Sequence, residues 1–439
     1  MSNVFRKSTV CLVLAASCAA LSAQQASAPA VQAGTRLTLA DAERLAIENN
    51  PDISVAQLLE LAQEQVTREV RSGQLPTVTG DLTAVGAHEN SRITAGLLNN
   101  PSVYDRSAGG LNVSQLLTDF GRTHRLVLSA RSNAKAQLDV ERATKQDITL
   151  AVDQAFYQAL TAQAVLKVAE QTVTERQATD DEINALTAAK LKSTLDLSFA
   201  DVELSQARLM LLDAQNATQS AMASLNALLG SENDDRYLLS DETPRDPEVA
   251  PDHAENMVQV AFSSRPDLAA LVDSSVAARQ FSAAEHDLSR PTVSALAAVG
   301  GTPVRADQIA SSWYGAAGAN ISIPVFNGFL YNARAREADL RAHAAQEQVR
   351  NLRDSIARDV RTAVLNAQTA FQRIGVTHQM LNESNMALDL AQTRYKIGLS
   401  GIVELSQAQL AQTQAEIAYA NARYAYQSAL AEVRFQTGQ

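Results

Sequence analysis

The chain has 439 residues, of which 46% are hydrophobic and only 5% aromatic, and its formal net charge is -11. Because a compact globular core draws on large aromatic rings, this composition favours elongated packing between helices. Binding to a nucleic-acid backbone requires a basic patch, so the acidic balance argues against a nucleic-acid partner.

The N-terminus has the layout of a secretory signal peptide. Arg6 and Lys7 precede an apolar run, and small residues follow it up to Ala23. We expect residues 1–23 to be removed as a leader, and residues 24–36, which are small and polar, to form a flexible lead-in. The protein is therefore predicted to be exported.

Both cysteines, Cys11 and Cys18, lie in or beside this leader. We expect the mature chain to contain no thiol and no disulfide, so its rigidity must come from another source. Cys18 also allows lipid attachment as an alternative, although residues 15–17 before it form a poor lipidation signal.

Two short helices open the mature chain. Residues 39–48 form the first helix, with Thr38 as its N-cap and Pro51 just beyond its end. Residues 52–71 form the second helix, which stops before Gly73.

The hydrophobic period then changes to two, which is typical of β-strands. Apolar or small residues alternate with polar ones over residues 77–86 and again over residues 109–114. We expect two strands here, each near the roughly 9–11 residues of a membrane strand. Beyond the leader no stretch reaches the roughly 18 consecutive apolar residues of a membrane-spanning helix, so a bilayer crossing would have to use such strands.

A stretch without glycine or proline, residues 122–229, follows the strands and predicts continuous helix. Apolar residues inside it alternate at spacings of four and three, which predicts a coiled-coil seam. The residues of this seam are Ile148, Val152, Ala155, Ala159, Ala162, Leu166, Ala169 and Val173. We expect the helix to reverse near residues 192–194, where no glycine marks a turn; the internal repeat described next is what places this reversal.

The second half of the chain repeats the first. A polar segment with three prolines, residues 231–252, separates the two halves. The tripeptide at residues 50–52 returns in similar form at 265–267, about 215 residues later. We interpret the chain as an internal duplication, with structural repeats at 37–230 and 253–439.

The second repeat again contains two period-two stretches, residues 292–299 and 313–323, and the pair Gly300-Gly301 predicts a turn after the first. A second long helix follows, and it ends at a reversal marked by Gly398 and Gly401, with a last helix over 402–435. Its predicted seam is Val360, Val364, Ala367, Phe371, Ile374, His378, Leu381, Asn385 and Leu388.

Each long helix would be a rod of roughly 100 Å, because a helix rises 1.5 Å per residue. Such rods must pack side by side with helices of the same chain or of neighbouring copies.

The four predicted strands cannot close a barrel alone, and lipid does not satisfy open sheet edges. Two copies would supply eight strands and three would supply twelve, and both numbers suit a membrane barrel.

Five motifs occur along the chain in an order that resembles one known family. They are Leu-Ala-Asp-Ala leading to Asn-Pro-Asp (39–52), Leu-Thr-Asp-Phe-Gly-Arg (117–122), Pro-Val-Phe-Asn-Gly (324–328), Tyr-Lys-Ile-Gly-Leu (395–399) and Ala-Asn-Ala-Arg-Tyr (420–424). Over almost its whole mature length the chain resembles the TolC family of outer-membrane efflux and secretion channels.

The resemblance implies a mainly α fold with membrane β: a strand pair and a long helical hairpin, duplicated. It implies a homotrimer whose twelve-stranded β-barrel lies in the outer-membrane lipid of a Gram-negative bacterium and continues as a periplasmic α-helical barrel. The expected function is a passive conduit in a tripartite efflux or type I secretion system. Its expected partners are a periplasmic adaptor protein and an inner-membrane RND or ABC transporter.

The resemblance also implies a periplasmic gate near the last helix reversal. Tyr395 matches a tyrosine that helps to hold the mouth shut, Glu404 matches an acidic ring position, and Gln407 stands where a second acid is expected. A ring of Glu404 carboxylates would attract cations. The alternative is that Glu404 is simply a solvated residue at a helix start, favoured by the helix dipole.

Two further sets of residues are candidate contact sites. Ile397, Gly398 and Leu399 resemble an adaptor-contact motif, whereas the alternative is a plain helix terminator. Trp313 and Tyr314 open a strand and could belong to an aromatic belt at the membrane interface, or could simply pack.

No sequence motif indicates catalysis, a cofactor or a metal ion. The six histidines lack metal-ligand spacing, and no nucleophile elbow or phosphate loop occurs. We therefore expect no enzyme activity. A secreted coiled-coil scaffold without a pore, or a periplasmic adaptor, remains the alternative; the scaffold would not need the four period-two stretches.

Overall fold

The structure is a computed structural model and describes residues 36–86, 92–95, 98–102, 105–231, 237–241, 254–304 and 311–439. The leader expected at 1–23, nearly all of the lead-in and most of the polar segment 231–252 lie outside the described residues. The expectations for these three segments remain predictions.

The first half of the chain contains two short helices, two long strands and a helical hairpin. These elements are α1 (Leu39–Asn49), α2 (Pro51–Ser72), β2 (Thr77–Val85), β5 (Arg106–Thr118), α3 (Arg122–Ala188) and α4 (Thr194–Leu228). The second half has the same order in α5 (Ala254–Ser264), α6 (Pro266–His286), β7 (Thr292–Val304), β8 (Trp313–Ser322), α7 (Leu330–Lys396) and α8 (Ile402–Thr437). Since α3 and α7 both have 67 residues, and α1 and α5 both have 11, the halves are built to one plan.

Shorter elements complete the described chain. β1 (Arg36–Leu37) pairs in parallel with β6 (Leu238–Leu239), which ties the start of the first half to the segment between the halves. β3 (Arg92–Ala95) and β4 (Leu98–Ser102) form a small antiparallel pair between β2 and β5 in the sequence.

Side-chain caps explain where the first two helices begin. The Thr38 hydroxyl accepts a hydrogen bond from the Asp41 backbone N–H at 3.2 Å, as the predicted N-cap should. The Asn50 side chain caps α2 by accepting from the Asp52 N–H at 2.9 Å, and its amide group donates to the Leu228 carbonyl at 2.9 Å. Asn50 therefore fixes the start of α2 and joins it to the end of α4.

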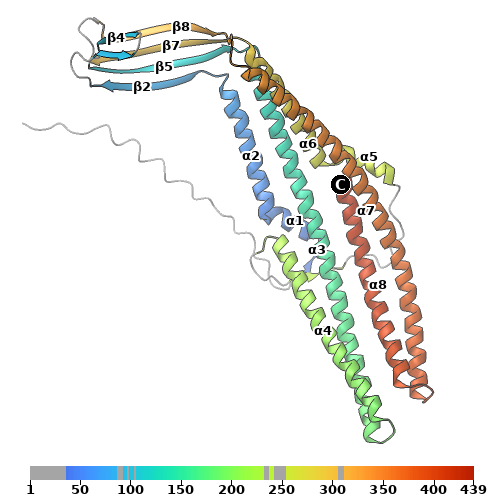
Figure 1. Cartoon of the computed structure of the whole chain (residues 1–439). Helices are drawn as coiled ribbons and strands as arrows, with labels where there is room; N and C mark the ends of the chain where they lie inside the picture. Colours follow the sequence, from blue (N-terminus) through green and yellow to red (C-terminus); the bar gives the residue numbers. More distant parts are fainter. Residues whose placement is uncertain are drawn as a thin grey trace, which may run out of the picture.

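The helices form an elongated bundle with the sheet at one end (Figure 1). α3 and α7 run its full length; α2 and α6 pack along their halves near the sheet, and α4 and α8 pack along their far halves. At 1.5 Å per residue, α3 and α7 are each about 100 Å long. The predicted rods are confirmed, and both hairpin turns lie at the end of the molecule opposite the sheet (Figure 1).

The predicted seam of α3 is confirmed, because none of its eight residues is exposed. Val152 and Ala159 are completely buried, and Ala169 is as well. They contact neighbouring helices of the same chain, and Val152 belongs to the main apolar cluster with Phe156 and Leu225.

The predicted seam of α7 is wrong in two places. His378 and Asn385 are exposed, and the residues one position earlier, Thr377 and Ser384, are buried instead. The two hydroxyls can be buried because they donate to carbonyls of their own helix, Thr377 to Arg373 at 2.8 Å and Ser384 to Leu381 at 3.0 Å. A histidine or asparagine side chain could not satisfy its polar groups in this way.

The four long strands form one antiparallel sheet in the order β2-β5-β7-β8. The register gives the sheet an apolar face and a polar face. The apolar face carries the exposed side chains of Val78, Leu82, Leu111, Val299, Trp313 and Ile321. The opposite face is polar in the half of the sheet that adjoins the helices, where it carries Thr77, Thr79, Asp81, Asn112 and Ser114.

The turn predicted at Gly300-Gly301 is wrong, because both glycines lie within β7, which continues to Val304. Gly300 pairs with Gly110 on one side and with Tyr314 on the other. A Cβ on Gly110 or Gly300 would collide with the Tyr314 side chain. The glycines are thus required for a close approach inside the sheet and do not reverse the chain.

Candidate functional site

The two helix reversals at the far end of the molecule have the same backbone geometry. Gly398, after α7, has φ 77°, and Lys190, after α3, has φ 60°. The N–H of Leu399 donates to the Arg394 carbonyl at 2.8 Å, and the N–H of Leu191 donates to the Leu186 carbonyl at 2.9 Å. Both helices therefore end in the same left-handed cap, although only the second uses glycine.

Tyr395 joins the two hairpins near these reversals. Its side chain is only 6% exposed and packs with Ile183 and Ala200 of the first hairpin. The Lys192 ammonium lies 4.0 Å from the centre of the Tyr395 ring, a cation–π contact between the hairpins. Burial raises the pKa of the Tyr395 phenol, so the ring stays neutral at physiological pH.

Glu404 and Gln407 lie one turn apart on α8, and both are exposed. Arg394, near the end of α7, forms an ion pair with Glu404 at 3.0 Å across the reversal. Sequence reasoning missed Arg394, although a basic residue one turn before a reversal is a usable signal for a partner of an acid just after it. The structure thus brings Tyr395, Glu404 and Gln407 together at one tip.

Both tips present apolar side chains to solvent. Ile397 is 63% exposed and Leu399 is 67% exposed, and on the other tip Leu191 is 71% exposed. Sequence reasoning missed Leu191, although the internal repeat makes it the equivalent of Leu399 in the first half of the chain. Exposed apolar residues of this size at a protein's end are typical of a contact surface.

Trp313 and Tyr314 lie at the opposite end of the molecule, at the start of β8. As neighbours on one strand they point to opposite faces of the sheet. Trp313 is 68% exposed on the apolar face, whereas Tyr314 lies over Gly110 and Gly300 on the polar face. The predicted interface role for the pair stays a prediction, and this geometry favours Trp313 for it.

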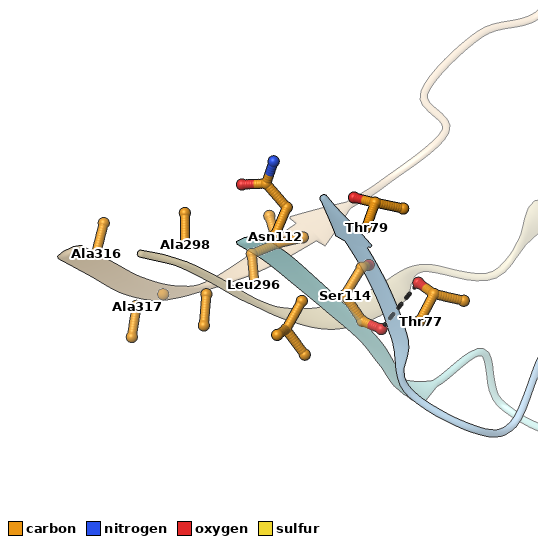
Figure 2. A pocket seen from close by; sticks show the side chains of 11 residues that line it. Thr77, Thr79, Asn112, Ser114, Leu296, Ala298, Ala316 and Ala317 are labelled. Carbon is orange, nitrogen blue, oxygen red and sulfur yellow. Dashed lines mark hydrogen bonds between the residues drawn. The ribbon is translucent and has the colours of Figure 1, made fainter. Parts of the chain in front are cut away.

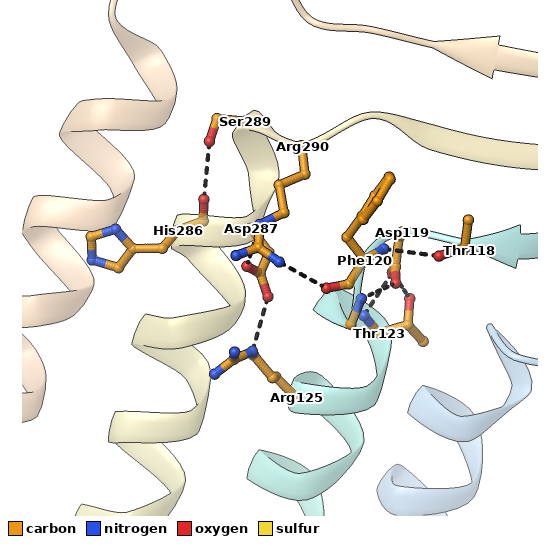
Figure 3. A network of polar contacts seen from close by, with 10 residues as sticks. Thr118, Asp119, Phe120, Thr123, Arg125, His286, Asp287, Ser289 and Arg290 are labelled. Atoms are coloured by element: carbon orange, nitrogen blue, oxygen red, sulfur yellow. Dashed lines mark hydrogen bonds and ion pairs between the residues drawn. The ribbon is translucent and has the colours of Figure 1, made fainter.

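A network of polar contacts holds the junction between the sheet and the helices (Figure 3). The Asp119 carboxylate accepts from the backbone N–H groups of Gly121 at 3.1 Å and Thr123 at 2.6 Å, which caps α3. Buried Asp287 pairs with Arg125 at 2.9 Å and with Arg290 at 3.2 Å. These contacts fix the angle at which the strands enter the helical bundle.

The described residues contain no group of three or more His, Cys, Asp or Glu side chains that could hold a metal ion. Among the helices that the structure describes, none combines the length and apolarity needed to cross a membrane.

A family model described as outer membrane efflux protein matches residues 42–231 and 257–439, most of the chain. The chain belongs to this family. As an outer membrane efflux protein it is a protein of the outer membrane, and its family consists of channels.

Two relatives illustrate how far the sequence similarity extends. Outer membrane protein OprJ of Pseudomonas aeruginosa is 24% identical over 395 residues, which cover 89% of this chain and 81% of OprJ. Outer membrane protein TolC of Salmonella enteritidis is 28% identical over 109 residues, 25% of this chain and 22% of TolC. The match with TolC thus spans less than a quarter of that protein.

Solved structures show that the fold of this efflux protein is shared. The outer membrane protein VceC of Vibrio cholerae has a TM-score of 0.79 at 19% sequence identity, with 91% of this chain and 96% of VceC covered. The predicted resemblance to the TolC family is therefore confirmed.

Proposed function

We propose that three copies of this chain form a passive conduit that exports small molecules or proteins across the outer membrane. The observation that supports this proposal most directly is the open sheet. Among the described strands, β2 and β8 each pair with a neighbour on one side only. Lipid cannot satisfy the unpaired backbone groups of such edges, so β8 of one copy pairs with β2 of the next.

Three copies give twelve strands, the number that the TolC resemblance implies, and the helices continue the bore as a periplasmic barrel. The sheet also bears on the alternatives. A coiled-coil scaffold or an adaptor accounts for the seams of α3 and α7. It does not account for a sheet with an exposed apolar face and two open edges.

Cysteine cross-linking tests the trimer, because the only two cysteines lie at positions 11 and 18. One cysteine on β2, such as Val78→Cys, is combined with single cysteines placed in turn along β8. We expect at least one pair to give disulfide-linked trimers in cell envelopes. The pair Val113→Cys and Ala297→Cys, which face each other within one sheet, is the control for intramolecular bonding. Finding only monomers for every pair would reject the proposal.

The gate of this conduit lies at the α7–α8 reversal. Tyr395 holds the two hairpins of one copy together, and the carboxylates of Glu404, with Gln407 one turn further, line the periplasmic mouth. Arg394 compensates part of the Glu404 charge. The exposed tip residues Ile397, Gly398 and Leu399 contact a periplasmic adaptor, which couples the conduit to an inner-membrane RND or ABC transporter. Trp313 anchors the far end of the sheet at the membrane interface.

Two substitutions that each remove one charge of the Arg394–Glu404 ion pair test the gate. Glu404→Gln removes a carboxylate from the mouth, so we expect a lower preference for cations over anions in planar bilayers. Arg394→Gln frees the same carboxylate from its partner, and we expect a higher cation preference. Unchanged ion selectivity in both variants would exclude Glu404 from the mouth.

A further inference from the structure

The polar face of the sheet is built from every second residue of each strand. On β2 these residues are Thr77, Thr79, Asp81 and Thr83, and their partners on β5 include Asn112 and Ser114. Figure 2 shows Thr79 and Asn112 on this face, and shows neighbouring Ala316 and Ala317 of β8 pointing to opposite sides. Small side chains, Ala298 and Ala316, continue the face across β7 and β8.

Asp81 is the one charged side chain among those that the structure describes on β2, β5, β7 and β8. The Asn112 side-chain amide donates a hydrogen bond to its carboxylate at 2.5 Å, across the strand pair. The residue directly opposite Asp81 is Gly110, and the neutral Tyr314 side chain lies over this glycine. Asp81 is exposed, and no described Lys or Arg forms an ion pair with it.

We propose that Asp81 is a selectivity-determining residue, which places a ring of three carboxylates inside the strand region and favours cationic over anionic solutes. The proposal rests on the proposed function, because the polar face encloses a lumen only when three copies close the sheet. The Asn112 amide orients each carboxylate without neutralising its charge. Among the described side chains of the polar face only these carboxylates are charged, and they contribute a negative potential.

The range of this potential depends on salt. The screening length is about 10 Å at 0.1 M salt and about 30 Å at 0.01 M. Carboxylates on the wall of a wide lumen therefore act weakly on its axis at high salt and strongly at low salt. The cation preference due to Asp81 should grow as salt is diluted.

The first experiment asks whether Asp81 faces water. The variant Asp81→Cys is treated in membranes with a charged, membrane-impermeant thiol reagent, and labelling is measured by mass. We expect Asp81→Cys and Thr83→Cys, both on the polar face, to react. Leu82→Cys lies between them on the apolar face and is expected to stay protected by lipid. If Leu82→Cys reacts while Asp81→Cys does not, the assignment of the faces is wrong.

The second experiment measures reversal potentials in planar bilayers under potassium chloride gradients. At low salt we expect Asp81→Asn to lower the cation-to-anion permeability ratio by about two- to five-fold, the size that Coulomb's law gives for three charges acting through water. Asp81→Glu keeps the charge and should keep the ratio. Asp81→Lys should lower the ratio further than Asp81→Asn does.

The outcomes separate the two proposals. A wild-type chain that never conducts would reject the conduit itself. A wild-type conduit whose selectivity is the same in Asp81→Asn, at low as at high salt, would overturn only the role of Asp81.

Discussion

Lys190 occupies a backbone conformation that favours glycine. Its φ is 60°, at the position where the second repeat has Gly398 with φ 77°. A left-handed conformation costs a residue with a Cβ roughly 1–2 kcal/mol. The Lys190 side chain is exposed, so nothing in its packing offsets this strain.

We predict that Lys190→Gly stabilises the first tip. Relief of the strain, less the added entropy of glycine in the unfolded chain, should amount to about 0.5–1 kcal/mol. Hydrogen exchange of the amides around residues 187–194 should slow accordingly, since it reports local opening. Lys190→Ala removes the same side chain but keeps the Cβ, and should leave exchange unchanged. Equal slowing in both variants would show that the side chain, and not the backbone, matters.

The sequence predicted elements better than the residues within them. Periods of 3.5 and 2 are properties of many residues together, so the four long helices of the two hairpins and the four long strands were predicted in the right places, although β5 and β7 extend beyond the predicted 109–114 and 292–299. The reversal at 192–194 was placed only by the repeat, and it is confirmed because Ser193 caps α4 by accepting from the Leu195 N–H at 2.9 Å. Two predictions were wrong: that His378, and not Thr377, is buried in the seam of α7, and that Gly300-Gly301 forms a turn. Both depend on contacts between helices or between strands, which no pattern in a single sequence contains.

The contact of α1 with α3 includes a buried pair of acids. Asp153 of α3 is only 5% exposed and lies close enough to Glu43 of α1 to interact with its carboxyl group, while Arg434 of α8 lies near enough to act on its charge. Burial, followed by the contact with Glu43, raises the pKa of the Asp153 carboxyl to about 7. Two carboxyl groups can share a hydrogen bond only if one of them holds a proton.

The pair should therefore make stability depend on pH. Because the pKa of Asp153 is higher in the folded state than its ordinary value of 3.8, the protonated form is the one that folding favours. Its contribution is fully present below about pH 4 and is lost as pH rises through about 7. We predict that Asp153→Asn, which stays neutral, reduces the fall in Tm between pH 5 and pH 8. A fall identical to that of the wild type would exclude Asp153 as its source.

At the scale of the whole molecule, α4 is apolar on two opposite sides. One side packs on α3 through Ala200, Leu204, Ala207, Ala214 and Leu225, all of them buried. On the other side Leu195, Val202 and Leu209 follow one another at steps of seven residues and are 53–62% exposed in the single chain. A helix that is apolar on both sides is buried on both sides. In the proposed trimer the second side packs against a neighbouring copy.

We predict that Leu209→Glu prevents assembly without unfolding the chain. Burial of a leucine contributes roughly 1.5–3 kcal/mol, and an unpaired carboxylate in the same place would cost several more. Each of the three interfaces would carry this loss, whereas the seam between α3 and α4 lies on the far side of the helix and is untouched. Light scattering in detergent should give a monomer with wild-type helix content. Gln215→Glu puts the same charge on an exposed flank of α4 and should leave a trimer. A trimeric Leu209→Glu protein would mean that this face of α4 contacts solvent in the assembly, and neighbouring copies would then have to meet elsewhere.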